Sequence, residues 1–333
     1  MAIGTGSVAS GSISIAIGGD SLASSTTSLA VGYEAVASGG FACAFGRSAQ
    51  SLGTLTSAIG SEAVATTGTY ATALTRSRAS GADSLAAAIA NTTSTYGATG
   101  ANSAAMGKLA KATVSNAFSL GASALASGLQ AYALGQNANA TNAYAYCLGG
   151  FSTASGYGSY AIGSSVNASS QYSVAIGRRA KTTIEGQFAF SGEQFSSQGD
   201  SQTSIYVLRS DTTDATPEAM ATDGPNTTRN TTNQIILPNN SAYAFHGTIV
   251  ARQQASAGTA CAAWKIEGLI RREGSAGTTV LVNSATTVLD NTPSWGMALS
   301  ADTTNGGLKI EVTGAAATNI RWVATVNTSE VTY

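Results

Sequence analysis

The chain reads Ser28-Leu-Ala-Val-Gly-Tyr-Glu-Ala-Val-Ala37 near its start, and variants of this phrase fill the first 191 of its 333 residues. Its central glycine belongs to a series spaced 14 residues apart; most of these glycines end an Ala-x-Gly phrase, and five of the eleven end the longer phrase Ser-x-Ala-x-Gly. A fixed period indicates a repeat architecture, in which every copy forms the same small unit and stacks on its neighbours. The series consists of Gly4, Gly18, Gly32, Gly46 and Gly60, then Gly107, Gly121, Gly135, Gly149, Gly163 and Gly177.

The period is interrupted between Gly60 and Gly107. We expect Leu74 to continue the series and Ala90 to supply the one further position needed before Gly107. Ala90 then follows Leu74 by 16 residues and precedes Gly107 by 17. These spacings place about five extra residues near the middle of the array. Ser191 takes the position after the last glycine, so the array is predicted to hold 14 repeats.

The residues before each glycine alternate between small and large side chains, as in Ser14-Ile-Ala-Ile17. An alternation with period two is typical of a β-strand. Fourteen residues suffice for two short strands and two tight turns, and stacking would pair each strand in parallel with its copy in the next repeat. We therefore expect a parallel β-roll whose thin coils hold only Ser, Ala and Gly inside.

The large residues of this alternation form an apolar column outside the coil. A single chain would expose the column as a stripe far larger than soluble proteins normally tolerate. We therefore expect self-association around the stripe, as three chains about one axis. The predicted trimer-packing column consists of Ile17, Val31, Phe45, Ile59, Leu120, Leu134, Leu148, Ile162 and Ile176.

The repeats resemble those of a known family. The phrases at 28–37 and Ser173-Val-Ala-Ile-Gly177 resemble the head repeat of YadA-type trimeric autotransporter adhesins. The resemblance covers residues 1–191 and implies a left-handed parallel β-roll in a homotrimer. The signal peptide, heptad-bearing stalk and membrane domain of complete adhesins are not seen in the chain, so export by their route is not expected.

The composition changes after residue 191. All four prolines, all three tryptophans and the single histidine lie beyond it. Residues 192–232 are predicted to be a polar connector with one strand candidate at 204–208, and residues 233–333 a second domain. Its strand candidates have the spacing of an antiparallel, jelly-roll-like β-sandwich. They are residues 234–237, 243–253, 260–271, 278–289, 296–300, 308–313 and 319–331.

Three phrases of the second domain are similar to a C-terminal module of tailed-bacteriophage fibre proteins. They are Asn233-Gln-Ile-Ile-Leu-Pro-Asn-Asn-Ser-Ala-Tyr-Ala-Phe245, Thr303-Thr-Asn-Gly-Gly-Leu-Lys-Ile310 and Ile320-Arg-Trp-Val-Ala-Thr-Val326. This resemblance covers about 130 residues and implies a virion protein that assembles in the host cytoplasm.

Together the two resemblances predict a virion tail fibre that mediates host attachment. Its partners would be other virion proteins and a host cell-surface receptor, with polysaccharide as the expected receptor class. Two alternatives stay open. A capsid head fibre or decoration protein could use the same fold, and a bacterial trimeric surface adhesin would share the repeats.

Other function classes are disfavoured by composition. Only 10% of the residues are charged and the net charge is −1, so no basic surface for nucleic acid is expected. No apolar run is long enough to span a membrane as a helix. His246 is the single histidine, and no catalytic, metal-site or phosphate-loop motif is present. We expect no enzyme activity, no catalytic residue, no metal and no cofactor.

An acidic cluster in the polar segment leaves two interpretations open. It could be a solvated loop or a cation site in a trimer. The cluster consists of Asp211, Asp214, Glu218 and Asp223.

An aromatic column three residues before the glycines marks the second half of the array. In-register stacking would turn it into a tyrosine ladder. The ladder could pack at the trimer interface or reflect a wider coil. It could also bind glycan, because tyrosine offers a flat face and a hydroxyl. The candidate glycan-binding residues are Tyr132, Tyr146 and Tyr160. Trp295, in a turn region, is a further candidate, with burial in the sandwich core as the alternative.

Overall fold

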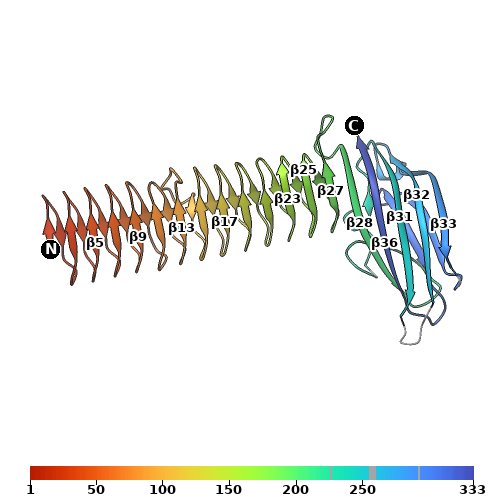
Figure 1. Ribbon diagram of the computed structural model, residues 1–333, viewed down its shortest axis with the longest axis horizontal. Coiled ribbons are helices and arrows are strands. Elements are labelled where there is room, and N and C mark those ends of the chain that lie inside the picture. Colours follow the sequence, from red (N-terminus) through yellow and green to blue (C-terminus); the bar gives the residue numbers. More distant parts are fainter. Residues whose placement is uncertain (226, 255–259, 292) are drawn as a thin grey trace. The chain divides into compact units, whose positions relative to one another are not determined.

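The computed structural model describes residues 1–225, 227–254, 260–291 and 293–333. The chain divides into two compact units, residues 1–158 and 159–333 (Figure 1). The elements in the described residues are β-strands, apart from one turn of 3-10 helix, η1 (Ala276–Thr278). The predicted all-β class is confirmed. Among these residues, no helix is both long and apolar enough to cross a membrane.

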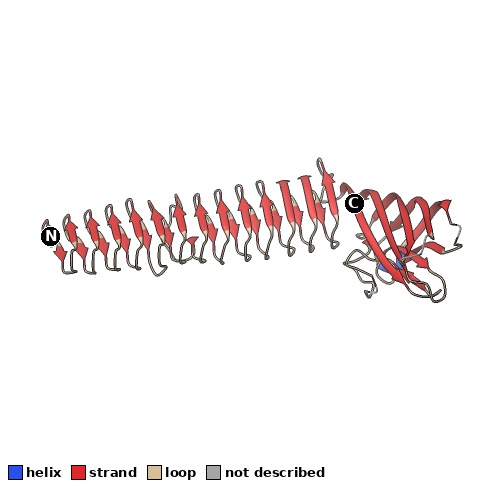
Figure 2. Cartoon of the chain, turned by 60° about the horizontal axis from the view of Figure 1, so that its bottom comes forward, coloured by secondary structure: helices blue, strands red, loops and turns tan. Residues whose placement is uncertain are grey.

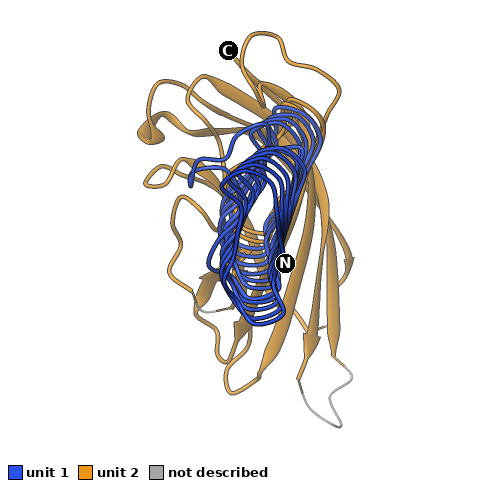
Figure 3. Cartoon of the chain, turned by 90° about the vertical axis from the view of Figure 1, so that its left-hand side faces the viewer, with its two compact units in different colours: residues 1–158 blue, residues 159–333 orange. Residues whose placement is uncertain are grey.

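Unit 1 is a parallel β-roll, in which each coil adds one strand to each of two sheets (Figures 1 and 2). Seen along the stack, its coils superpose as flattened loops (Figure 3). The first sheet contains β1 (Ala2–Ile3), β3 (Ile15–Ile17), β5 (Leu29–Val31), β7 (Cys43–Phe45), β9 (Ser57–Ile59), β11 (Thr72–Leu74), β13 (Leu85–Ala87), β15 (Ala104–Met106), β17 (Phe118–Leu120), β19 (Tyr132–Leu134) and β21 (Tyr146–Leu148). The second sheet contains β2 (Val8–Ala9), β4 (Leu22–Ala23), β6 (Val36–Ala37), β8 (Gln50–Ser51), β10 (Val64–Ala65), β12 (Arg78–Ala79), β14 (Gly97–Ala98), β16 (Lys111–Ala112), β18 (Leu125–Ala126), β20 (Asn139–Ala140) and β22 (Thr153–Ala154).

Small side chains fill the interior of each coil. Ala16 and Ala30, in the middle of β3 and β5, are fully buried, as are their counterparts along the stack. The serine two residues earlier also turns inward, and its hydroxyl closes the preceding turn: Ser14 Oγ donates to the Gly11 carbonyl at 2.7 Å. The repeated Ser-x-Ala-x-Gly phrase therefore combines a turn closure with a filler small enough for the coil.

The backbone requires the glycines that follow the regular first-sheet strands. Gly32 has a φ of +137°, and a Cβ there would lie 2.4 Å from the carbonyl oxygen of Gly46 in the next coil. This φ and the close approach both exclude a side chain. The 14-residue spacing of glycines thus follows directly from the stacking of coils.

The structure corrects the first interrupted position by one residue. Leu74 pairs with Ile59, so the position equivalent to Gly60 is Thr75 and not Leu74. The segment from β10 to β11 holds one residue more than in a regular coil, and the segment from β11 to β12 holds one fewer. The shift is invisible in the sequence because Thr75 has no glycine to mark it.

The second interrupted position is also corrected. Ala87 pairs with Met106, so Ala88 and not Ala90 is the equivalent of the glycines. The excess of five residues is as predicted, but it lies wholly in the segment between β13 and β14. Ile89 follows Ala88 and is fully buried there, so it does not belong to the outward column.

Unit 2 begins with further roll strands. β23 (Tyr160–Ser164), β25 (Val174–Arg178) and β27 (Phe188–Ser191) pair in parallel, as do β24 (Asn167–Ala168) and β26 (Lys181–Thr182). β27 then pairs antiparallel with β28 (Ser201–Thr212). The polar segment 192–232 therefore contains a 12-residue strand, considerably longer than the candidate at 204–208.

The remainder of unit 2 is an antiparallel sandwich of two sheets, as predicted. The first sheet has the order β28, β36 (Ile320–Thr332), β31 (Ser241–Gln253), β32 (Cys261–Arg272) and β33 (Val280–Asp290). In the second sheet, β35 (Gly307–Thr313) pairs with β29 (Pro217–Ala219), β30 (Ile235–Ile236) and β34 (Gly296–Asp302).

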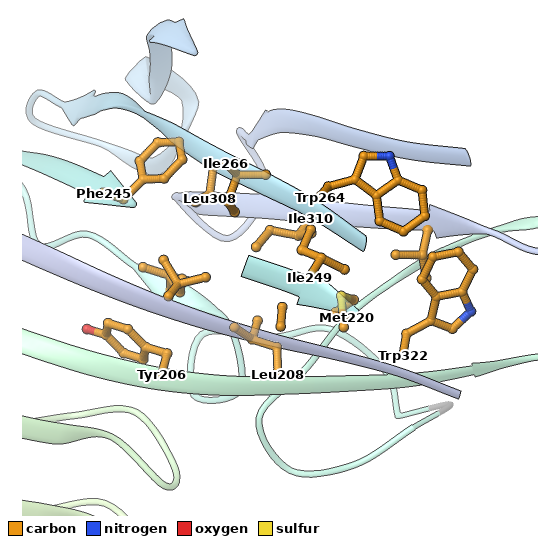
Figure 4. Close-up of a cluster of buried hydrophobic side chains, with 14 of the residues drawn as sticks. Tyr206, Leu208, Met220, Phe245, Ile249, Trp264, Ile266, Leu308, Ile310 and Trp322 are labelled. Atoms are coloured by element: carbon orange, nitrogen blue, oxygen red, sulfur yellow. The ribbon is translucent and has the colours of Figure 1, made fainter. Parts of the chain in front are cut away.

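The two sheets enclose one apolar core (Figure 4). Along β36, Ile320, Trp322, Ala324 and Val326 are buried, while the residues between them are more exposed. This period-two burial is the pattern of a strand with one face on a core. The opposite sheet contributes Leu308, Ile310 and Val312 from β35 in the same way.

Candidate functional site

The outer face of the first sheet in unit 1 carries two columns of large side chains. In each three-residue strand the middle residue is buried, and the residues on either side point outward. The apolar column is therefore on the outside of the coil, as predicted. Its exposure varies in the single chain: Phe45, Ile59 and Leu120 are exposed, whereas Ile17, Val31, Leu134, Leu148, Ile162 and Ile176 are half-buried.

The tyrosine ladder exists in unit 1. The rings of Tyr132 and Tyr146 stack with centroids 4.9 Å apart and planes 4° from parallel. Phe118 lies 6.1 Å from Tyr132 at a tilt of 33°. Tyr132 remains 37% exposed. In unit 2, Tyr160 begins β23 and is 39% exposed.

The ladder and the apolar column share one face. Tyr132 and Leu134 are the two outward residues of β19, and Tyr146 and Leu148 are those of β21. A chain that packs against the leucines would also contact the tyrosines. The two predicted roles, trimer packing and glycan binding, therefore compete for the same surface in these coils.

Of the two interpretations of Trp295, burial in the sandwich core is confirmed and an exposed binding aromatic is excluded. Its side chain is 5% exposed and belongs to the sandwich core. Trp322 lies between two other indoles, with its centroid 5.8 Å from that of Trp295 and 5.7 Å from that of Trp264. The turn before β34 directs Trp295 inward, because its backbone N–H and C=O both bond to the side chain of Asn291.

Within the described residues of the single chain, the acidic segment does not assemble a cation site, and a site shared between the chains of a trimer stays a prediction. No three His, Cys, Asp or Glu side chains gather there or elsewhere in the described parts of the chain. The carboxylates take separate partners: Asp211 pairs with Arg321, Asp214 accepts from the Thr216 N–H, and Glu218 accepts from Ser210.

A buried polar network in unit 2 is the main feature that the sequence analysis missed. The carboxylate of Glu330 accepts hydrogen bonds from Thr328 (2.6 Å), Tyr206 (3.1 Å) and Gln202 (2.8 Å). Gln187 in turn donates to the Tyr206 hydroxyl at 3.0 Å. The network joins a roll turn to the sandwich within unit 2. Glu330 has the same parity as the buried residues of β36, which is the signal that could have revealed it.

A cavity of about 180 Å³ adjoins this network. Its walls combine polar and apolar groups, and the fully buried Tyr206 belongs to both the network and the cavity. The lining residues include Lys181, Gln198, Asp200, Ile236, Pro238 and Tyr243.

Replacing Glu330 by glutamine tests the electrostatics of the network. Burial raises the pKa of Glu330, although hydrogen bonds from Thr328 and Gln202 act in the opposite direction. A carboxyl whose pKa is higher in the folded chain contributes stability below its unfolded pKa and loses that contribution as pH rises through the folded pKa. We expect wild type to gain thermal stability relative to Glu330→Gln as pH falls from neutral toward about 4.3, the ordinary glutamate value.

The measurement is the midpoint of thermal unfolding of both proteins over that pH range. Glu311→Gln serves as the control, since Glu311 lies nearer the surface and pairs with Lys309 at 2.9 Å. A difference between wild type and Glu330→Gln that does not change with pH would contradict the predicted direction of the pKa shift.

The comparisons with known proteins concern mainly the roll. A family model described as the YadA head domain repeat, in two copies, matches residues 1–21, 23–49, 51–74, 98–124, 126–145 and 148–181. The roll is therefore similar to YadA head repeats over these residues. The unmatched residues 75–97 coincide with the irregular coils, where Thr75 and Ala88 replace the glycines.

A search of curated proteins gives no match. Among solved structures, the chain is similar to the tailspike protein gp49 from Acinetobacter baumannii bacteriophage Fri1, a capsular polysaccharide depolymerase. The identity is 8% and the TM-score 0.25, over 96% of this chain and 48% of that one. The chain thus spans about half the length of this structure.

Proposed function

We propose that this chain is the subunit of a homotrimeric virion tail fibre that attaches to host cell-surface polysaccharide. The observation that carries the proposal is the outward apolar face of the roll, formed by side chains such as Phe45, Ile59 and Leu120. Exposed apolar surface that continues over many strands is typical of an interaction site. Every coil presents this face in the same direction, so a partner that repeats with the same period, a second copy of the chain, fits it best.

The proposal assigns the shared face to chain packing. Stacked tyrosines and aliphatic side chains in alternating columns make a dense apolar surface, and aromatic pairs add to its burial energy. A glycan-binding strip would need this face open to solvent. We therefore propose that Tyr132 and Tyr146 pack in the trimer, and that glycan binds another part of the roll or the sandwich.

Virion membership is supported by the C-terminal phrases that are similar to fibre proteins of tailed bacteriophages. The YadA head repeats favour the second candidate, a bacterial trimeric adhesin. Mass spectrometry of purified virions and of host cell envelopes distinguishes the two candidates. The proposal requires the chain in virions, whereas an adhesin would be found in the cell envelope. Immunogold labelling at the tail supports a tail fibre, whereas labelling at the capsid identifies a head fibre or decoration protein.

The trimer and the attachment are tested on the purified full chain. Light scattering should give three times 33.1 kDa, about 99 kDa. The labelled protein should bind host cells, and enzymatic removal of surface polysaccharide should abolish that binding. We propose binding without cleavage, so incubation with host polysaccharide should release no reducing sugar. A stable monomer or binding to stripped cells would overturn the proposal.

A further inference from the structure

One corner of the roll in unit 1 carries exposed apolar side chains on a backbone that disfavours them. In the turns from the second sheet to the first, one residue per coil has a φ between +54° and +59° in the first half of the unit. We call these residues the left-handed corner. They are Ile13, Thr27, Phe41, Leu55 and Tyr70.

Bulky and β-branched residues are rare in this conformation, whereas Asn and Asp tolerate it. In the next coils the same column follows that preference with Asp83, Asn102 and Asn116, but Tyr144, in a later coil of unit 1, departs from it again with a φ of 57° and an exposed fraction of 39%. The left-handed corner departs from it and also exposes apolar surface to water. The exposed fractions are 81% for Ile13, 57% for Phe41, 38% for Leu55 and 58% for Tyr70. Residues kept in conformations that cost free energy are a reason to look for function.

The turns that carry the left-handed corner contain no charged residue, and the first charge in the column is Asp83, one coil beyond Tyr70. The turns beside it read Gly11-Ser12, Gly39-Gly40 and Gly53-Thr54, so the large side chains stand on small neighbours. Charge in this half of the unit gathers instead at the other turn of the coils, where Arg47 pairs with Glu62 at 2.7 Å and Arg76 with Glu62 at 3.4 Å. In these coils, one turn of the flattened loop (Figure 3) thus carries the charged residues, and the opposite turn carries the left-handed corner.

We propose that the left-handed corner binds an uncharged polysaccharide laid along the stack of coils. The side chains of Phe41 and Tyr70 offer ring faces on which sugar rings stack, with Leu55 between them. Two coils separate these rings, about 9.6 Å at the strand spacing of a β-sheet. That distance is comparable to the length of a disaccharide, so one chain can contact both rings. No charged residue of the corner column stands between Phe41 and Tyr70, and the carboxylate of Asp83 in the next coil disfavours an anionic glycan, so we expect a neutral one.

This inference rests on the proposed attachment function and names the receptor-contacting surface. Phe41→Asn combined with Tyr70→Asn removes both rings and places a residue suited to the backbone at each position. Phe151→Asn is the matched control, because Phe151 has a φ of 58° and is 59% exposed but lies at the other turn of the coils.

The probe is affinity electrophoresis of the full chain in gels that contain dextran, mannan, galactomannan or the anionic polygalacturonate. We expect retardation of wild type and Phe151→Asn by at least one neutral polymer. The double variant should bind that polymer at least about tenfold more weakly, because a trimer loses six rings at once. Its thermal midpoint should stay equal or rise, since the strained residues are gone.

Three results would overturn the inference: no retardation of wild type by a neutral polymer, unchanged binding of the double variant, or a loss of trimer mass in the double variant. The last would show that the corner contacts a second copy of the chain. Host-cell binding that persists in the double variant would place the receptor site elsewhere and leave the proposed attachment function intact.

Discussion

Gly135→Ala is expected to destabilise the roll by roughly 3 kcal/mol or more, which is large against the stability of a typical domain. Gly135 has a φ of +136°, and a Cβ there would lie 2.6 Å from the carbonyl oxygen of Gly149. The methyl group would meet backbone and not a side chain that could rotate away. Relief therefore requires the two coils to separate, which breaks the parallel pairing of β19 with β21.

Gly150→Ala is the matched control for this prediction. A Cβ on Gly150 would lie 3.6 Å from the carbonyl oxygen of Gln136, an ordinary contact, and its φ is not left-handed. Midpoints of chemical unfolding for the two variants should differ clearly, with Gly150→Ala close to wild type. Equal midpoints would mean that the glycine series is not imposed by the stacking of coils.

Leu134→Asp is expected to convert the trimer into folded monomers. Leu134 points outward from β19, so a single chain can hydrate the new carboxylate without unfolding. In the proposed trimer, three carboxylates would be buried close together without partners, and an unpaired buried charge costs several kcal/mol. Light scattering should report a mass near 33.1 kDa, with an unchanged circular dichroism spectrum.

Asn139→Asp provides the control for the trimer prediction. Asn139 lies on the second sheet, where it begins β20, and it is half-buried in the single chain. The same change of charge there should leave the trimer intact. A trimeric Leu134→Asp protein would show that the apolar face is not the packing surface and would return the tyrosine ladder to consideration as a glycan site.

The roll was predictable because its constraints are local and repeated. In the regular coils, the backbone of the next coil leaves no room for a side chain at the glycine, and the coil interior has room only for small residues such as alanine and serine. The same residue types therefore recur from one coil to the next. The prediction failed at Thr75 and Ala88, where no glycine marks the column. The register of strand pairing determines which residue takes the glycine position, and this register cannot be predicted from the sequence of a single irregular repeat.

The sandwich strands were predictable from their alternation, but the placement of single side chains was not. Trp295 lies beside turn residues, a context equally compatible with a surface aromatic and with a core one. Its burial depends on how the turn before β34 bends, through Asn291. Glu330 presents the opposite case, since strand parity points it inward while its charge suggests a surface position.

The irregular coils have a consequence for how such a chain changes length. Five additional residues enter between β13 and β14, yet the strands on both sides keep their parallel pairing: β13 pairs with β15, and β14 with β16. The inserted residues thus lie outside the two sheets, and the register of the strands is unchanged after them. A scaffold with that property tolerates grafted loops in the segment between β13 and β14, and it can grow by whole coils without redesign of the rest.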